Sequence, residues 1–593
     1  MAYLDDVFSP DDIKKMAVPE LEILAEEMRG AILKRCSAIG GHVGSNLGMV
    51  EATIALHYVF SSPKDKIVFD VSHQCYAHKL LTGRKEGFLN PDEYGKISGF
   101  TNPNESEHDL FMVGHTSTSL SLAAGLAKAR DLLNQKHNVI AVIGDGSLSG
   151  GEAMEGLSFA GSELKSNLIV VVNDNGMSMV ENHGGIYQNL ELLKQTKGKA
   201  TLNIFKALGY DYLYVDEGND VEALIKAFRE VKDCTKPVVV HLNTVKGKGY
   251  LPAEENKEQW HKHQPFEVAT GMSPAKFQGQ TYNDLTRDYF MKCLDEGMPL
   301  AVVTAATPNA FGFSPEVRQK FGKNYIDVGI AEDYATSMVT ALAKGCCKPV
   351  FCVQSSFVQR AYDQILHDLA LNKSPALILI YNCGLSDADA THLGCFDVAM
   401  ITNIPNMLYL SPAMAEEYMM MLDWAVKQTD YPVAMRVPSG MPVFGNAFHN
   451  EKLELHRSQV INRGSKIAVI TDGHCLAKGK EVIMELKKYG FCSTLVNARF
   501  LDAPDEQLFD ELEKDHQIIV TIEDGIVSGG FGEKVTAFYG AKEMKVLNYG
   551  GKKEFTNRVP LNEIYEKNRL NVSQIVEDIL RLTGVFEPLK LVK

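Results

Sequence analysis

The chain has 593 residues, 45% of them hydrophobic and 23% charged, which is ordinary for a globular protein and excludes a mostly disordered, collagen-like or membrane-embedded chain. Acidic residues outnumber basic ones by 75 to 60, and this excess opposes non-specific binding to nucleic acid. At roughly 100–200 residues per domain, the length indicates several domains.

The N-terminal segment and the cysteines indicate a cytoplasmic protein. The chain begins MAYLDDVFSPDD, which is acidic where a secretion signal is basic. The 11 cysteines are scattered without paired CxxC spacing, so we expect reduced thiols and neither a disulfide framework nor structural zinc. Apolar runs such as 168–172 are far shorter than the roughly 20 residues of a membrane helix. We therefore expect a soluble, cytoplasmic chain with neither a membrane nor a nucleic acid as partner.

Short, apolar and β-branched runs recur along the chain, and each predicts a strand of a parallel sheet that is covered on both faces. The eight runs are Val139–Ile143, Leu168–Val172, Val238–Leu242, Ala301–Thr304, Pro349–Val353, Ala376–Tyr381, Ile467–Thr471 and Ile518–Ile522. Helical stretches such as Gly151–Glu163 and Asp333–Lys344 lie between them, which gives a repeated strand–helix–strand pattern. The predicted fold class is α/β with largely parallel sheets.

Two polar stretches rich in proline and glycine interrupt this pattern and are typical of connections between domains. They span about residues 252–281 and 438–465. Division at these stretches predicts three α/β domains, at 1–265, 280–440 and 460–593.

Two strand ends carry residues suited to a metal ion and a diphosphate. The run Val139–Ile143 leads into Gly144-Asp145-Gly146, and glycines at a strand-to-helix turn let the backbone approach an anion closely. Thirty residues later the next strand ends in Asn173-Asp174-Asn175-Gly176-Met177. A lone Gly-Asp-Gly is usually an ordinary turn, but Mg²⁺ prefers carboxylate, amide and phosphate oxygens. The combined spacing is typical of thiamine diphosphate enzymes, with Asp145 and Asn175 as metal ligands.

Longer segments resemble a single family, in the same order along nearly the whole chain. These segments are GGHVGSNLG, VSHQCYAHKLLTGR, ESEHD, VGHTSTSLS, IGDGSLSGG, NDNGMSMVEN, IAEDYA, SSFVQRAYDQILHD, MRVPSG and EDGIVSGGFGE. On them the chain is similar to the 1-deoxy-D-xylulose-5-phosphate synthase family of the transketolase superfamily. The resemblance implies diphosphate-binding, pyrimidine-binding and transketolase C-terminal domains. It also implies a homodimer with thiamine diphosphate and Mg²⁺ held between the first two domains.

The activity that the resemblance implies is a decarboxylative condensation. Pyruvate and D-glyceraldehyde 3-phosphate give 1-deoxy-D-xylulose 5-phosphate and carbon dioxide, which feeds isoprenoid and thiamine biosynthesis. Three alternatives stay open at this point. They are transketolase-type transfer of a ketol unit between other sugars, a 2-oxoacid dehydrogenase component that serves a lipoyl domain, and a non-catalytic paralogue.

Roles at the cofactor follow from the same resemblance. Glu332, in Ile-Ala-Glu, is implied to share a proton with the aminopyrimidine, and Phe357 to lie against the pyrimidine ring. Met177 is implied to lend its backbone carbonyl to Mg²⁺. The remaining cofactor-binding residues implied are His73, His115, Ser117, Asp145, Gly146, Ser147, Asn175 and Lys246.

Roles at the substrate fall to histidines and arginines. Imidazole groups transfer protons near neutral pH, and His42, His261 and His392 are implied to be catalytic together with Glu332; His263 lies close to His261 in a divergent stretch. Guanidinium groups suit phosphate and carboxylate oxygens. The implied substrate-binding residues are Arg360, Arg436, His42 and His392. The alternative for each arginine is an ion pair at a domain interface.

Three positions depart from the family pattern, and all three fall in the implied substrate pocket. Where the family has Asp-Arg-Ala-Gly this chain has 381–384 as Tyr-Asn-Cys-Gly, so Asn382 replaces an anion-binding arginine. Ala388 stands four residues before the histidine of Thr-His-x-Gly, where the family has an acidic residue, and Gln354 replaces a tyrosine. The identity of the acceptor is therefore the part of the function that the sequence leaves open.

Overall fold

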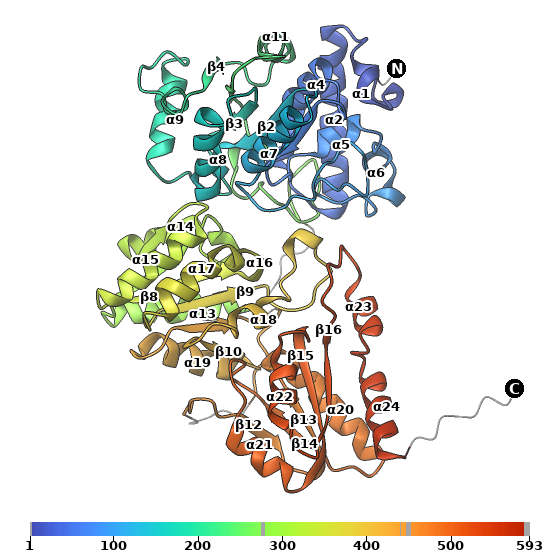
Figure 1. Ribbon diagram of the computed structural model, residues 1–593, viewed down its shortest axis with the longest axis vertical. Helices are drawn as coiled ribbons and strands as arrows, with labels where there is room; N and C mark the ends of the chain where they lie inside the picture. The colour runs from blue at the N-terminus through green and yellow to red at the C-terminus, as the bar shows by residue number, and fades with distance from the viewer. Residues whose placement is uncertain (1–2, 274–278, 439, 446–451, 586–593) are drawn as a thin grey trace, which may run out of the picture. The chain divides into compact units, whose positions relative to one another are not determined.

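The computed structural model describes residues 3–273, 279–438, 440–445 and 452–585. These form two compact units, the first made of Met1–Phe277 with Val328–Ala331 and the second of Gln278–Asp327 with Glu332–Lys593. Figure 1 shows the sheets and helices of each unit in chain order.

The first unit contains a five-stranded sheet in the order β1-β2-β3-β5-β4, and every neighbouring pair is parallel. Its strands are β1 (Lys66–Phe69), β2 (Val139–Gly144), β3 (Ile169–Asp174), β4 (Asp211–Val215) and β5 (Val238–Asn243). Its α-helices are α1 (Pro10–Ile13), α2 (Val18–Ile39), α3 (Gly44–Leu47), α4 (Val50–Val59), α5 (Tyr76–Leu81), α6 (Glu86–Leu89), α7 (Ser119–Leu132), α8 (Gly151–Ser162), α9 (Gly185–Gln195), α10 (Ile204–Ala207), α11 (Val221–Val231) and α12 (Leu251–Glu255).

Alternate residues of this sheet face two different hydrophobic cores, which explains why its strands lack an apolar–polar alternation. Ile140 and Val142 of β2 belong to the core that contains α2, α4 and α11. Ala141 and Ile143 belong to the core that contains α7 and α8. A parallel strand covered by helices on both faces has no solvent-facing side to fill with polar residues.

The second unit begins with a six-stranded, all-parallel sheet in the order β10-β11-β9-β8-β6-β7. Its strands are β6 (Leu300–Thr304), β7 (Tyr325–Asp327), β8 (Lys348–Gln354), β9 (Leu377–Tyr381), β10 (Leu408–Leu410) and β11 (Val433–Arg436). The associated helices are α13 (Tyr282–Asp295), α14 (Pro315–Phe321), α15 (Glu332–Lys344), α16 (Ser355–Val358), α17 (Tyr362–Gln364), a π-helix at Ile365–Ala370, α18 (Asp397–Ile401) and α19 (Ala415–Lys427).

A third sheet follows in the same unit, in the order β12-β14-β13-β15-β16, with β12 antiparallel and the other pairs parallel. Its strands are β12 (Gln459–Asn462), β13 (Lys466–Thr471), β14 (Thr494–Asn497), β15 (His516–Ile526) and β16 (Lys545–Gly551). Its helices are α20 (Leu476–Lys488), α21 (Glu506–Glu513), α22 (Phe531–Tyr539), α23 (Leu561–Lys567) and α24 (Val572–Thr583).

The α/β prediction is confirmed. Each of the eight predicted runs forms a strand, and both predicted helical stretches form helices, α8 and α15. The connection predicted at 438–465 contains the short strand β12, and its residues 439 and 446–451 lie outside the described residues, as do 274–278 of the other connection. The domain limits themselves stay a prediction. In the part of the chain that the structure describes, no helix has both the length and the apolarity needed to cross a bilayer.

Candidate functional site

The carboxyl ends of β2 and β3 bring the two predicted metal-binding segments together. The strands pair in parallel with Gly144 opposite Asn173, so Asp145 and the segment 174–177 emerge at the same edge of the sheet. Asp145 is buried, and its Oδ2 accepts a hydrogen bond of 2.7 Å from the amide of Asn182. Burial and the nearby charge of Asp174 raise the pKa of Asp145 to about 7.

This arrangement fits a hard cation. The pKa of Asp145 stays raised although the charges of Lys246 and Lys194 oppose the shift, and a divalent ion would add further positive charge. The expected donors are one carboxylate, one amide and one carbonyl, all oxygens that Mg²⁺ accepts. In the described residues no group of three or more His, Cys, Asp or Glu side chains could hold a metal ion.

The turn after β3 is fixed by residues that the sequence reasoning did not single out. Asp174 accepts hydrogen bonds from Nε2 of His241 at 2.9 Å and from the backbone N–H of Gly176 at 3.0 Å. Lys194 contacts the same carboxylate at 3.2 Å. Asp174 and Asn182 stand in the matched segment NDNGMSMVEN, which was the available signal. No motif indicated the contact of Asp174 with His241, which lies 67 residues further along the chain.

Lys246, Ser117 and Ser147 lie around the same edge. Nζ of Lys246 donates to the carbonyl of Ser178 at 2.5 Å, and burial lowers its pKa to about 8. Ser117 has a positive φ of 75°, and its hydroxyl donates to the carbonyl of Ser147 at 2.8 Å. The carboxylate of Asp70, also absent from our predictions, accepts the backbone N–H of Ser117 at 2.9 Å. A cationic amine and tightly packed loops are what a diphosphate site requires.

Three of the predicted histidines form a cluster in the first unit. The ring centroids of His42, His73 and His261 are 5.1–5.7 Å apart, and Phe100 lies 5.7 Å from His42. Nδ1 of His261 is buried and accepts or donates no hydrogen bond within the described residues. Burial, followed by the charge of Lys246, lowers the pKa of His261 well below its usual value, so its imidazole is neutral at pH 7.

His263, the alternative to His261, lies elsewhere. Its ring stacks on Trp260 with centroids 4.1 Å apart, and its Nδ1 contacts the carbonyl of Gln264. The structure therefore brings His261, and not His263, to His42 and His73. His115 is half-buried two residues before Ser117.

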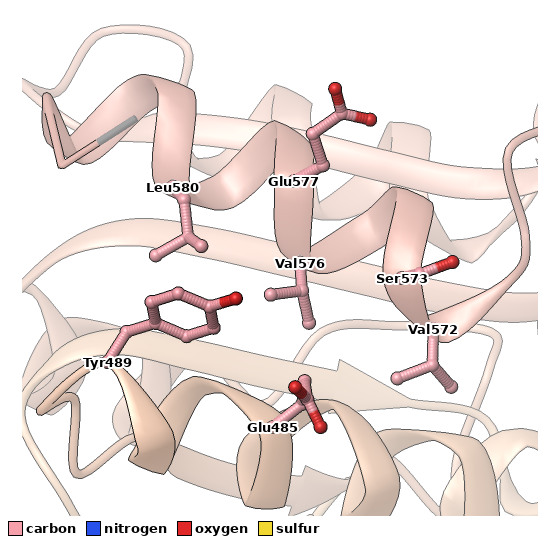
Figure 2. Close-up of a pocket in the computed structure, with 7 residues that line it drawn as sticks. All are labelled: Glu485, Tyr489, Val572, Ser573, Val576, Glu577 and Leu580. Atoms are coloured by element: carbon pink, nitrogen blue, oxygen red, sulfur yellow. The ribbon is translucent and has the colours of Figure 1, made fainter. Parts of the chain in front are cut away.

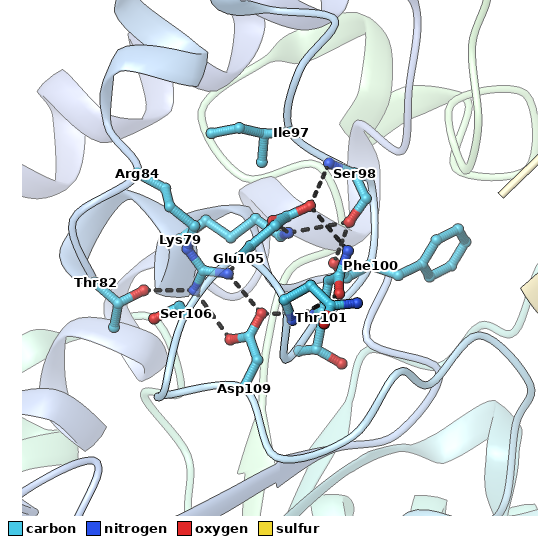
Figure 3. Close-up of polar contacts among 12 residues, drawn as sticks. Lys79, Thr82, Arg84, Ile97, Ser98, Phe100, Thr101, Glu105, Ser106 and Asp109 are labelled. Atoms are coloured by element: carbon cyan, nitrogen blue, oxygen red, sulfur yellow. Dashed lines mark hydrogen bonds and ion pairs between the residues drawn. The ribbon is translucent and has the colours of Figure 1, made fainter. Parts of the chain in front are cut away.

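A buried ionic network holds the segment 98–109, which carries Phe100. Figure 3 shows Lys79 and Arg84 facing Glu105 and Asp109 of the predicted ESEHD segment. Glu105 also accepts the backbone N–H of Ser98, while Asp109 accepts that of Asn102 at 2.7 Å. These contacts fix both ends of the 98–109 segment.

In the second unit, Glu332 is the first residue of α15 and its side chain is buried. Its Oε2 lies 3.5 Å from Nη1 of Arg360 and accepts no hydrogen bond within the described residues. Burial raises the pKa of Glu332, although the Arg360 charge opposes the shift. A buried carboxyl group with a raised pKa and an oxygen that accepts no hydrogen bond fits the expected contact with an aminopyrimidine nitrogen. Arg360, expected at the substrate, lies beside this carboxyl group.

Phe357 and His392 also lie together in this unit. Their ring centroids are 5.7 Å apart in an edge-to-face arrangement, and Nδ1 of His392 is 2.8 Å from the hydroxyl of Thr391. Two of the three departures from the family pattern meet close by on adjacent strands. The amide of Asn382 donates to the side-chain oxygen of Gln354 at 3.2 Å, so a neutral amide pair occupies this strand edge.

Arg436 has the ion-pair arrangement that was the alternative to its expected substrate role. Its side chain is fully buried at 0% exposure. Its guanidinium donates to Asp397 at 2.8 Å, to Asp472 at 2.8 Å and to the carbonyl of Asp524 at 2.6 Å. The aligned motif could not reveal these three partners. Because the guanidinium is committed to them, we leave Arg436 out of the proposed substrate site.

A groove of about 580 Å³ lies between α20 and α24, far along the chain from the predicted site residues. Figure 2 shows that Tyr489, Val576 and Leu580 line it, with Glu485 and Glu577 beside them. None of the predicted site residues belongs to this groove.

Comparison with protein families gives three consecutive matches. Residues 4–203 and 193–244 match the family described as 1-deoxy-D-xylulose-5-phosphate synthase. Residues 278–441 match the transketolase pyrimidine-binding domain, and residues 456–575 match the transketolase C-terminal domain.

Curated relatives match over almost their full length. The 1-deoxy-D-xylulose-5-phosphate synthase of Caldanaerobacter subterraneus subsp. tengcongensis is 36% identical, over 98% of this chain and 99% of the relative. The enzyme of the same name from Symbiobacterium thermophilum is 39% identical, over 91% of this chain and 88% of the relative. The one from Brevibacillus brevis is 37% identical, over 90% of this chain and 91% of the relative. Among solved structures, transketolase from Leishmania mexicana matches 97% of this chain and 99% of its own, with 16% identity and a TM-score of 0.43.

Proposed function

Because the chain belongs to the 1-deoxy-D-xylulose-5-phosphate synthase family, we propose that it condenses pyruvate with D-glyceraldehyde 3-phosphate to give 1-deoxy-D-xylulose 5-phosphate and carbon dioxide. The observation that carries this proposal is the match over 98% of this chain and 99% of a relative with that name. The enzyme is a transferase of the thiamine diphosphate-dependent transketolase type. We further propose Mg²⁺ as the metal and a cytoplasmic homodimer as the active form.

We assign the diphosphate and metal to the first unit. Asp145, Asn175 and the carbonyl of Met177 would bind Mg²⁺, and Lys246 would pair with the diphosphate. Ser117, Gly146 and Ser147 would present close-packed backbone and hydroxyl groups to it. The raised pKa of Asp145 and the short contacts of Lys246 and Ser117 support this assignment. When bound, thiamine diphosphate supplies a carbanion and an electron sink, which no amino-acid side chain provides.

The remaining roles concern proton transfer and orientation. Glu332 would hold the proton that it shares with an aminopyrimidine nitrogen, and Phe357 would support that ring. His42, His73 and His261 would supply imidazole groups, which can accept or donate a proton near neutral pH. His115 would border them. His392 and Arg360 would orient the acceptor.

A labelling experiment tests the function. Purified protein with thiamine diphosphate, Mg²⁺, ¹³C-labelled pyruvate and glyceraldehyde 3-phosphate is followed by NMR. We expect label in 1-deoxy-D-xylulose 5-phosphate, together with carbon dioxide. A parallel sample with xylulose 5-phosphate as donor tests ketol transfer. Consumption of that donor while pyruvate stays unchanged would overturn the proposal and identify the Gln354–Asn382 pair as the mark of another transketolase.

The same samples address the remaining alternatives. Reduction of a lipoyl domain would indicate a 2-oxoacid dehydrogenase component. The Glu332→Ala variant separates catalysis from cofactor binding alone, because a non-catalytic paralogue would show the same background rate before and after the substitution.

A further inference from the structure

The loop from Asn382 to Cys395, which we call the acceptor loop, follows β9 and carries Asn382, Ala388 and His392. It is closed on itself at its base, where the N–H of Gly384 donates to the carbonyl of Gly394 at 3.2 Å. The loop also contains a short 3-10 helix at Ala390–His392, and its other residues lie outside helices and strands. Its conformation therefore depends on contacts from outside the loop.

Two of these contacts come from the second sheet and the turn after β8: the amide of Asn382 donates to Gln354, and the hydroxyl of Ser355 donates to the carbonyl of Gly394 at 2.8 Å. The others come from the third sheet and the segment after it. Oδ1 of Asp524 accepts the N–H of Leu385 at 2.9 Å. The side chain of Asn557 accepts the N–H of Ala390 at 3.1 Å, and the N–H of Arg558 donates to the carbonyl of Ala388 at 3.0 Å. A further bond of 3.1 Å joins the N–H of Ile526 to the carbonyl of Cys395. These last four bonds hold the loop at four separate positions.

Asp524 is itself held rigidly on the other side. Its N–H donates to Oδ2 of Asp472 at 2.9 Å, and its carbonyl accepts from Arg436 at 2.6 Å. Its Oδ2 lies 3.4 Å from Nδ1 of His474, whose side chain is 8% exposed. Two backbone contacts thus fix the main chain of Asp524, and the contact with His474 orients its carboxylate, so that Oδ1 is presented to the loop in a defined direction.

The shape of the loop is adapted to this carboxylate. Gly384 has a positive φ of 92°, and a β-carbon at that position would lie 1.9 Å from Oδ2 of Asp524. The carboxylate therefore occupies space that only glycine leaves empty. Hydrogen bonds from backbone N–H groups to a charged acceptor are stronger than those to a neutral one. Of the side chains that bond to the loop backbone from the third sheet and the segment after it, Asp524 therefore makes the stronger bond and Asn557 the weaker one.

We propose that Asp524, with Asn557, is a positioning residue of the reaction: it sets the geometry of the acceptor loop and thereby the placement of His392 and Asn382 against the acceptor substrate. The role rests on the proposed function, because the acceptor is the substrate assigned to that loop. A small displacement of groups that orient a substrate is enough to change turnover by one or two orders of magnitude. The effect is expected on the acceptor and not on pyruvate.

Steady-state kinetics of four variants test the proposal. Asp524→Ala and Asn557→Ala remove the side-chain oxygens that accept the hydrogen bonds of the loop. Each variant is expected to raise the KM for glyceraldehyde 3-phosphate about tenfold, while the KM for pyruvate stays within about twofold of wild type. Asp524→Asn and Asn557→Asp keep an acceptor oxygen and should restore at least part of the loss. Asp510→Ala, on the exposed face of α21, is the control and should leave both constants unchanged.

Hydrogen exchange separates this proposal from the function itself. In the wild-type holoenzyme the amides of Leu385 and Ala390 should be protected, and each should lose protection in the matching alanine variant, whatever acceptor the enzyme uses. If both alanine variants keep this protection, or keep the wild-type KM for the acceptor, the positioning role is wrong. If the wild type makes no 1-deoxy-D-xylulose 5-phosphate but the amides behave as stated, the function fails and the loop contact stands. If Asp524→Ala does not fold, the test rests on Asn557→Ala alone, because the side chain of Asn557 is exposed.

Discussion

Oε2 of Glu332 lies 3.5 Å from Nη1 of Arg360, and the two side chains differ sharply in burial: the carboxyl group is 5% exposed and the guanidinium 24%. The arginine can thus keep part of its hydration, whereas the carboxyl group depends on its neighbours. A group that approaches the carboxyl oxygens of Glu332 therefore affects the carboxyl group more strongly than it affects the guanidinium of Arg360.

Replacement of Glu332 should separate activity from stability. Glu332→Gln is expected to lower kcat by about 10²-fold or more, because the proton shared with the pyrimidine is lost. The thermal midpoint without cofactor should stay within a few degrees of wild type, since Arg360 is solvated and the buried charge is removed. Turnover assays and thermal unfolding measure both. Tyr334→Phe, at an exposed position on the same helix, is the control. Wild-type turnover in Glu332→Gln would contradict the catalytic role.

His261 and His263 form a matched pair for testing the histidine cluster. His261→Ala should lower kcat/KM by about 10²-fold, because it removes a neutral imidazole beside His42 and His73. His263→Ala removes a ring that stacks on Trp260 and should leave kcat/KM within about threefold. Equal losses in the two variants would show that the effect comes from disturbed packing and not from the cluster.

Arg436 should matter for stability and not for substrate binding. Arg436→Met leaves the buried carboxylates of Asp397 and Asp472 without their partner, which costs about 3–5 kcal/mol. We expect a clearly lower thermal midpoint, with the KM for pyruvate close to wild type wherever the variant is folded. Arg463→Met, which breaks an exposed pair with Asp515, should change the midpoint little. An Arg436→Lys variant with a normal midpoint and a protected Leu385 amide, but with a raised KM for glyceraldehyde 3-phosphate, would restore the substrate role.

The buried pair His57 and His78 should make the protein sensitive to acid. Nε2 of His57 lies 2.8 Å from Nδ1 of His78, whose Nε2 contacts Asp109 at 2.8 Å. Burial, followed by the neighbouring His78, lowers the pKa of His57 well below 6.5, and burial lowers that of His78 to about 4. The unfolded chain then binds more protons than the native one below pH 6.5, so stability is present at neutral pH and falls as the pH decreases.

A substitution checks this pH dependence. As the pH falls from 6.5 to 5, the histidines of the unfolded chain take up protons that the buried pair does not, so stability decreases over this range. His57→Gln should therefore flatten the fall of the thermal midpoint over that range, whereas His367→Gln, at an exposed position, should keep the wild-type slope. Thermal unfolding at several pH values measures this. Identical slopes in wild type and His57→Gln would exclude a contribution of His57.

The buried strands were accessible from sequence because their composition has a direct physical cause. Helices on both faces of β2 and β8 require apolar residues at every position, and such runs are rare elsewhere. The short strand β12 was not predicted, since it lies at a sheet edge within a stretch rich in proline and glycine. Its pairing with β14 depends on residues more than thirty positions away.

The site was accessible only as far as its motifs reach. The segments around Asp145 and Asn175 could be recognised from the sequence, because the oxygen ligands of such a site must follow two strands that are adjacent in the sheet. The aligned Arg436 resembled an anion-binding residue, but burial and partners decide what a guanidinium does, and Asp397 and Asp472 are 39 and 36 positions away. The contact of Asp174 with His241 was not predicted either, because the two residues are 67 positions apart.

The bond between Leu385 and Asp524 spans 139 positions of the chain. During synthesis the acceptor loop therefore leaves the ribosome long before the carboxylate that fixes it exists. A chain that ended before residue 524 would contain every residue of the second sheet yet lack the group that fills the space beside Gly384. The working shape of the loop is consequently a property of the finished polypeptide, and the last third of the chain completes a site to which the earlier parts contribute the chemistry.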